Sequence, residues 1–203
     1  PTPRRPRAAP MEDSVVEETR VLFTEAAEVE RLVLSLAHAT PPAAVEAAAS
    51  IARTLDKYQE APTVLDSSLE PIVSPLLSTV RSIARGEGER GLLAPACAVM
   101  YTLCKVRGYK TIVKFVPHEA RDLEPLVALL AQVPPDAHEE WQVAYSLMVW
   151  LSMVVMVPFD LSIIDSSSAH HPAGTSSAVP LVKRIEQLAC AHLSSPGPAR
   201  DAA

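Results

Sequence analysis

The sequence predicts an all-α protein built as an α-solenoid. Of its 203 residues, 48% are hydrophobic, whereas aromatic residues make up 4% and glycines number 6, which favours helices over a β-sandwich or barrel. No segment alternates apolar and polar residues as a half-buried strand does. Helix starts expected near residues 40, 91 and 138 lie about 50 residues apart, close to the ~40–47 residues of two-helix HEAT or armadillo repeats. We therefore favour stacked HEAT/armadillo-like repeats over a compact helical bundle, because repeat units contact their neighbours alone.

Residues 1–11 are expected to form a disordered N-terminal tail, since they are rich in proline and arginine and contain little to bury. Residues 12–203 are expected to form one segment of helical repeats. The first helix is predicted over residues 12–39, because apolar residues recur there at spacings of three and four. This apolar stripe consists of Leu22, Ala26, Val29, Val33 and Leu36.

The second helix is predicted to begin after Thr40, which suits the N-cap, with Pro41 at the first helical position. It is expected to continue to about residue 58. Its inner side is expected to carry Val45, Ala48, Ala52 and Leu55.

Ser67 and Glu70 have the spacing of a capping box, which predicts the start of a third helix that continues to about residue 85. Pro75 lies within this helix and predicts a kink or a later start. The fourth helix is predicted over residues 92–106, and Gly108, after two basic residues, is typical of a helix stop.

The next helix is expected to open at residue 117 and to end at residue 133, before two prolines. Its apolar positions follow the i, i+3, i+4, i+7 pattern. They are Leu123, Leu126, Val127 and Leu130.

The longest apolar stretch lies at residues 141–160. Asp136 and Glu139 have capping spacing and predict the start of its helix, and Pro158 predicts the end. A membrane span is the competing interpretation. However, the uninterrupted apolar part, 143–157, is shorter than the ~20 residues that a bilayer core requires, and no basic cluster flanks it. We therefore expect a buried helix and no membrane span.

A serine-rich irregular loop that includes His170 and His171 is expected over about residues 159–177, followed by a helix over 178–193. Residues 199–203 read as the beginning of a further helix. The chain is therefore expected to be a fragment of a larger solenoid.

The composition argues against several classes of function. A net charge of −6 and a pI near 5.5 give no general case for nucleic-acid binding. Residues 86–91 match G-x-G-x-x-G, but a predicted helix precedes them instead of the strand that a dinucleotide site requires. His118-Glu119 and His138-Glu139 begin like H-E-x-x-H, yet neither has the second histidine. We expect no enzyme, no metal site and no cofactor.

The three cysteines, Cys97, Cys104 and Cys190, form no C-x-x-C motif and are expected to be small buried hydrophobes in a reducing compartment. No apolar signal-peptide core follows the basic N-terminus, and the chain contains no asparagine that could accept a glycan. A cytosolic location is the expectation.

Basic residues concentrate in one place, between residues 105 and 114, and two interpretations remain open. They can favour a helix C-terminus and a solvated face. Alternatively, they can contact an acidic partner, with an arginine as a bidentate anchor. An exposed Tyr109 or Phe115 would favour the second interpretation. The candidate partner-binding residues are Lys105, Arg107, Tyr109, Lys110 and Lys114.

Six segments give the sequence a resemblance to the tubulin-specific chaperone D family, also called tubulin folding cofactor D. They are LDKYQEAP (55–62) with LD (65–66), KVRGYKT (105–111), FVPHE (115–119), WLS (150–152), PFD (158–160) and ARDAA (199–203). They occur in the order and at the spacing of the family. The resemblance spans residues 53–203 and departs in the loop at 86–91, at Pro71 and Pro75, and in the insert after Asp165.

The resemblance implies a long HEAT/armadillo-type solenoid that binds β-tubulin and helps to assemble or dismantle the αβ-tubulin heterodimer. It also implies α-tubulin, other tubulin folding cofactors and a small Arf-like GTPase as partners, with stimulation of GTP hydrolysis by the cofactor complex. The implied location is the cytoplasm, at microtubules and centrosomes. It supplies no catalytic residues. The alternative is an α-solenoid adaptor or scaffold unrelated to tubulin.

Overall fold

The computed structural model describes residues 22–156, 160–166, 179–195 and 197–203. These residues form helices and no strands, so the all-α prediction is confirmed for the part of the chain described. The expected disordered tail at 1–11, the helix-ending Pro158 and the histidine pair at 170–171 lie outside the described residues.

The elements follow one another as short helices joined by short connections. The α-helices are α1 (Ala26–Leu36), α2 (Pro41–Asp56), α3 (Leu69–Ala84), α4 (Leu93–Leu103), α5 (Tyr109–Ile112), α6 (Leu123–Leu130), α7 (Trp141–Val154), α8 (Leu161–Ile164), α9 (Leu181–Leu193) and α10 (Pro198–Ala202). The 3-10 helices are η1 (Pro62–Ser68), η2 (Arg90–Leu92), η4 (Val113–Phe115) and η5 (Ala120–Asp122), and η3 (Cys104–Gly108) is a π-helix.

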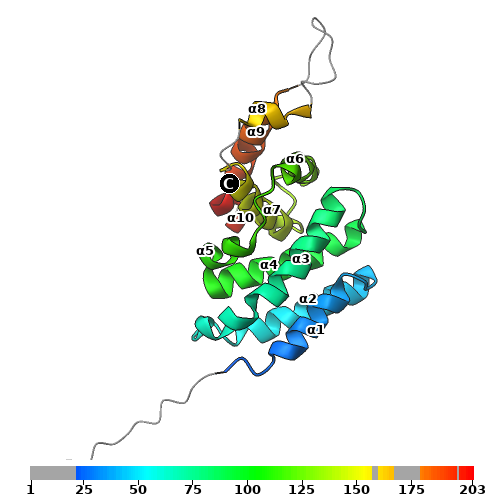
Figure 1. The fold of residues 1–203 in the computed structure, drawn as a ribbon, viewed down its shortest axis with the longest axis vertical. Helices are drawn as coiled ribbons and strands as arrows, with labels where there is room; N and C mark the ends of the chain where they lie inside the picture. Colours follow the sequence, from blue (N-terminus) through cyan, green and yellow to red (C-terminus); the bar gives the residue numbers. More distant parts are fainter. Residues whose placement is uncertain (1–21, 157–159, 167–178, 196) are drawn as a thin grey trace, which may run out of the picture.

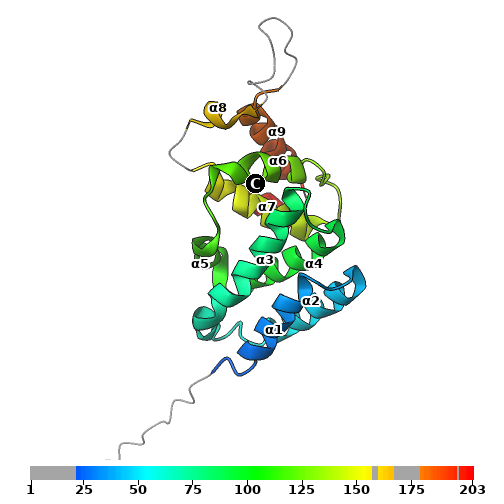
Figure 2. The same ribbon diagram turned by 45° about the vertical axis from the view of Figure 1, so that its right-hand side comes forward.

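The helices stack as successive pairs, α1–α2, α3–α4, α6–α7 and α9–α10 (Figures 1 and 2). The first helices of the pairs, α1, α3, α6 and α9, pack on one another in sequence and form a first layer. The second helices, α2, α4, α7 and α10, form a second layer in the same way. Each pair therefore packs mainly on its neighbours, as the repeats of a solenoid do.

The apolar face of α6 is confirmed, because Leu123, Leu126, Val127 and Leu130 are all buried. In α1 the predicted Val29, Val33 and Leu36 are buried as well.

Two stripe positions are wrong. Leu22 precedes α1 and its side chain is 66% exposed, and Val45 is 56% exposed. The buried side of α2 consists instead of Ala44, Ala48, Ile51 and Leu55. Because small apolar residues, mostly alanine, occupy most sides of α2, the apolar pattern alone did not determine which side of the helix faces the core.

The buried character of α7 is confirmed, since most of its side chains, from Val143 to Val154, are buried. Its start is later than predicted. Residues 134–140 form two turns instead of a capped helix start, with the amide of Ala137 donating to the Pro134 carbonyl and that of Glu140 to the Ala137 carbonyl. Within the described residues, none of the helices is both long enough and apolar enough to cross a bilayer.

Thr40 is the N-cap residue of α2, as predicted, but the predicted capping box at Ser67 and Glu70 does not form. The 3-10 helix η1 runs directly into α3, and Ser68, the N-cap residue of α3, makes no side-chain capping hydrogen bond. Pro75 lies inside α3, which neither begins nor ends there.

Three other boundaries differ from the prediction. The helix expected from residue 117 begins at Leu123, after η5. The fourth helix gives way to the π-helix η3 after Leu103. Gly108, the last residue of η3, has a φ of +92°, which glycine adopts at little cost. The loop expected over 159–177 contains the short helix α8.

Candidate partner-binding surface

The predicted basic residues lie at one end of α4, on η3, α5 and η4. The π-helix η3 presents Lys105 and Arg107, and α5 presents Tyr109 and Lys110. Lys114 follows on η4. The structure therefore brings the five candidate residues to one edge of the helical stack, which we call the basic edge.

Two members of the basic edge are paired within the chain. The Nε and Nη2 atoms of Arg107 donate to the two carboxylate oxygens of Asp66, with an Nη2–Oδ2 distance of 2.9 Å. The Arg107 guanidinium thereby holds the pKa of Asp66 below its usual value. The Nζ of Lys105 lies 2.6 Å from Oδ1 of Asp56, at the end of α2. These ion pairs connect η3 to η1 and to α2. Arg107 and Lys105 therefore have an internal structural role, which the sequence did not reveal.

The other three members are available at the surface. Tyr109 is 51% exposed, and Lys110 and Lys114 are exposed and form no ion pair with any residue that the structure describes. Phe115 is partly buried against the core, so it does not join them. The exposed part of the basic edge is therefore Tyr109, Lys110 and Lys114.

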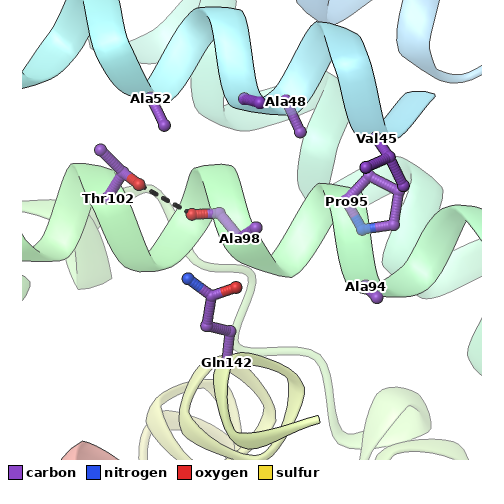
Figure 3. Close-up of a pocket in the computed structure, with 9 residues that line it drawn as sticks. Val45, Ala48, Ala52, Ala94, Pro95, Ala98, Thr102 and Gln142 are labelled. Carbon is purple, nitrogen blue, oxygen red and sulfur yellow. Dashed lines mark hydrogen bonds between the residues drawn. The ribbon is translucent and has the colours of Figure 1, made fainter. Parts of the chain in front are cut away.

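A groove lies between α2 and α4 in the second layer (Figure 3). It has a volume of about 330 Å³, and the side chain of Gln142 reaches towards it from α7. Every residue that lines it is uncharged. The lining is Val45, Ala48, Ala49, Ala52, Ala94, Pro95, Ala98, Thr102 and Gln142.

An aromatic cluster lies between α4 and α7. The ring of Tyr101 meets that of Trp141 edge-on at a centroid distance of 4.5 Å, and that of Tyr145 at 5.1 Å. All three side chains are partly exposed. The sequence alone did not indicate this cluster. Its signal was the spacing of Ala94, Ala98, Tyr101 and Lys105 at four, three and four residues, which places them on one helix face.

A buried ionic cluster occupies the other layer. The Asp122 carboxylate is 2% exposed and accepts hydrogen bonds from Nη2 of Arg81 at 2.5 Å and from Nη2 of Arg85 at 2.7 Å. Arg81 also pairs with Glu119, and the indole N–H of Trp150 donates to the Pro117 carbonyl at 3.1 Å. These contacts tie α3 to the start of α6 and to α7.

The residues that first suggested chemistry do not assemble into a site. In the described residues no three of the histidine, cysteine, aspartate and glutamate side chains are grouped as metal ligands. The loop at 86–91 follows α3, so it lacks the preceding strand of a dinucleotide site. Cys97 and Cys104 are buried as expected, and burial raises the pKa of each thiol to about 12. The prediction for Cys190 is wrong, because it is exposed on a sparsely packed helix, α9.

Comparison with known proteins gives a consistent result. A family model described as "Tubulin-specific chaperone D-like, ARM repeat" matches residues 55–203. The chain is 24% identical to tubulin-specific chaperone D of Dictyostelium discoideum, over 68% of this chain and 14% of that protein. It is 28% identical to tubulin-folding cofactor D of Schizosaccharomyces pombe, over 52% of this chain and 9% of that protein.

The chain thus spans 14% or less of the length of these two relatives. No solved structure matches it. The ARM-repeat description agrees with the stacked helical pairs, so the prediction of an armadillo-like α-solenoid is confirmed.

Proposed function

This chain belongs to the tubulin-specific chaperone D-like family of ARM-repeat proteins, and from that membership we propose that it forms part of a tubulin-folding cofactor. The observation that carries the proposal is the family match over residues 55–203, together with two relatives named for tubulin folding. The protein acts as a chaperone rather than as an enzyme: its helical repeats bind a folded partner and hold it for assembly.

In finer detail, the cofactor binds β-tubulin and takes part in assembling and dismantling the αβ-tubulin heterodimer. Its other partners are α-tubulin, further tubulin folding cofactors and a small Arf-like GTPase. In the cofactor complex it stimulates GTP hydrolysis. It works in the cytoplasm, at microtubules and centrosomes. An extended stack of helices supports this role, because it offers a long surface for a protein partner.

The exposed basic edge supplies a physical route to such a partner. Lys110 and Lys114 form no ion pair with a described residue, although Lys114 lies near enough to Asp66 to help lower the pKa of that carboxyl. Their exposed charge can attract an acidic surface. Tyr109 beside them offers a large contact area at low entropic cost. We therefore assign the approach of an acidic partner to Tyr109, Lys110 and Lys114, and the support of that edge to Lys105 and Arg107.

The first test is a pull-down from cytosol with the full-length protein, with and without residues 1–203, probed for β-tubulin and for the Arf-like GTPase. We expect the deletion to reduce recovery of at least one of these partners. If the complete protein recovers neither of them, the proposal is wrong, and an α-solenoid adaptor unrelated to tubulin becomes the better account.

A charge reversal tests the basic edge. The double change Lys110→Glu and Lys114→Glu should lower the association rate constant for tubulin about 3- to 10-fold at low salt, because rim charges act mainly on the encounter rate. It should also flatten the dependence of that rate on salt. The measurement is stopped-flow association at several ionic strengths.

The matched control is Lys183→Glu on α9, which replaces an exposed lysine away from the basic edge. It should leave the rate unchanged. An unchanged rate and salt slope in the double variant would remove these lysines from the contact.

A further inference from the structure

Helix α9 is held to the rest of the stack mainly at its two ends. Leu181, in its first turn, and His192, in its last turn, are the two side chains of this helix that are buried. Ile185, Leu188 and Ala189, which lie between them, are partly buried against the core. The state of the two end residues therefore decides how firmly α9 is docked.

The first end of α9 is fixed by burial and by one hydrogen bond. The backbone N–H of Leu181 donates to Oδ2 of the buried Asp165 at 2.8 Å. An acceptor in this place satisfies one of the amides that a helix start leaves without a partner inside the helix. This anchor therefore consists of an apolar side chain and a capping bond.

The second end of α9 rests on the connection between α6 and α7, residues 131–140. The hydroxyl of Ser195 donates to the carbonyl of Pro135 in this connection, and the backbone N–H of Ser195 donates to the carbonyl of His192 at 3.0 Å. The backbone of Val133 lies beside the His192 side chain. The imidazole is therefore enclosed at the junction between the pair α6–α7 and the pair α9–α10.

The His192 side chain is buried without a hydrogen-bond partner. It is 1% exposed, and neither Nδ1 nor Nε2 forms a hydrogen bond with a described residue. Burial lowers the pKa of His192, and the backbone of Val133 raises it to a lesser extent. A neutral imidazole can stay in such a place, whereas an imidazolium would lose its water without gaining an opposite charge. The second anchor of α9 is therefore stable in its neutral form.

The elements around α9 carry charged groups, and each of them has to be considered. Helices α6, α8 and α10 pack against α9, and α7, which has no charged residue, lines an apolar pocket with it. The acidic residues of α6 and of its connection to α7 are Glu124, Asp136, Glu139 and Glu140. Those between the start of α8 and the end of α10 are Asp160, Asp165, Glu186 and Asp201. The other titratable residues of these segments are His138, Lys183, Arg184, Cys190 and Arg200.

None of these groups acts on the charge of His192. Its pKa responds to burial and to the backbone of Val133, with no contribution from a charged side chain of the described residues. No carboxylate is therefore in place to stabilise the protonated imidazole.

We propose that His192 is a proton-sensitive anchor: when its imidazole is protonated, the end of α9 leaves the α6–α7 connection, and the junction between the pairs α6–α7 and α9–α10 opens. The contacts among α1 to α7 do not pass through His192, so these helices keep their packing. The inference is independent of the proposed function, because it concerns the stack itself and requires no partner.

The direction of the pH dependence follows from the lowered pKa. A released histidine titrates near 6.5, whereas the docked His192 has a lower pKa. Docking of α9 is therefore complete above about pH 6.5 and weakens as the pH falls through the lowered pKa. Acidification, rather than alkalinisation, opens the junction.

Hydrogen exchange of the full-length protein, read by mass spectrometry between about pH 7.5 and about pH 5.5, tests the proposal. Rates are converted to protection factors, which removes the intrinsic effect of pH on exchange. We expect the protection of peptides from α9 to fall at least about threefold over this range, while that of peptides from α4 stays constant. Constant protection of α9, or an equal loss in α4, would overturn the proposal.

Two variants separate His192 from other titrating groups. His192→Leu keeps a side chain in the buried place and removes the proton-binding site, so α9 should lose its pH dependence. His138→Gln, at an exposed histidine in the α6–α7 connection, is the matched control and should retain it. A pH dependence that survives in His192→Leu, or that disappears in His138→Gln, would show that another group is responsible.

A direct titration decides the case in which His192→Leu leaves α9 undocked at every pH. The slow exchange of the imidazole C2 hydrogen, followed by mass spectrometry of the wild-type protein, gives the pKa of His192 itself. We expect a value below about 6.5, the value of a free histidine, with the loss of α9 protection in the same pH range. A pKa of about 6.5 or higher would overturn the proposal.

Discussion

At the scale of single residues, the charges that matter most to this molecule are those that find partners far away in the sequence. Arg107 pairs with Asp66, and Lys105 with Asp56, across more than forty positions. The sequence showed the basic residues but could not show these aspartates beside them, because the pairing depends on how η3 packs on η1. A local count of charge therefore overstated the free positive charge of the basic edge.

Asp122 gives a test at this scale. Its carboxylate is buried between two guanidinium groups, so Asp122→Ala should leave Arg81 and Arg85 without their shared partner. We expect the free energy of unfolding to fall by about 2–4 kcal/mol, towards the lower side of the range for a broken buried pair because both arginines keep some access to water. Urea denaturation followed by circular dichroism measures it.

Asp136→Ala, at an exposed turn before α7, is the comparison and should cost less than about 0.5 kcal/mol. Should Asp122→Ala prove equally mild, the ionic cluster would not hold α3 to α6 as described.

At the scale of the elements, apolar spacing was a good guide to helices and a poor guide to their ends. The stripe on α6 was correct at all four positions, and Leu129 beside it is buried as well. On α2, where alanine occupies nearly every side, Ala48 and Leu55 were predicted correctly but Val45 was placed on the wrong side. The 3-10 helix η1 and the π-helix η3 displaced the predicted helix boundaries, since neither has a distinct sequence pattern.

Gly91 tests how closely two elements approach. A Cβ added at this position in η2 would lie 2.6 Å from Cγ of Pro41 at the start of α2, nearer than atoms can pack. Gly91→Ala should therefore force η2 away from α2 and lower the free energy of unfolding by about 1–3 kcal/mol. Thermal melting reads out the loss.

Glu89→Ala, two residues earlier in the same connection, serves as the matched change and should be close to neutral. Equal melting temperatures for the two variants would show that η2 can move away from α2 without a measurable loss of stability.

At the scale of the whole molecule, burial is unevenly divided along the stack. In α4, which lies between α2 and α7, eight of 11 residues are buried, whereas in α9 two of 13 are. The repeat spacing in the sequence predicted the solenoid. It did not predict the difference in burial between α4 and α9, because that difference depends on which helices have neighbours on both sides. The candidate groove was likewise beyond the sequence, because it exists between helices whose residues are about fifty positions apart.

Hydrogen exchange should follow this gradient. We expect the backbone amides of α4 to exchange at least about tenfold more slowly than those of α9, because local opening costs least where few side chains are buried. Mass spectrometry of peptides from the exchanged protein gives the comparison, with α7 expected to resemble α4. Uniform protection along the chain would contradict a stack that opens pair by pair.

The stacking of helical pairs also has a mechanical consequence. Because the main contacts join each pair to the next, a small rotation at one junction need not disturb the packing within any pair. Such rotations would add along the stack, so small changes at several junctions could bend the whole stack of helical pairs. Bending of the stack would then change its curvature while every helix stays intact.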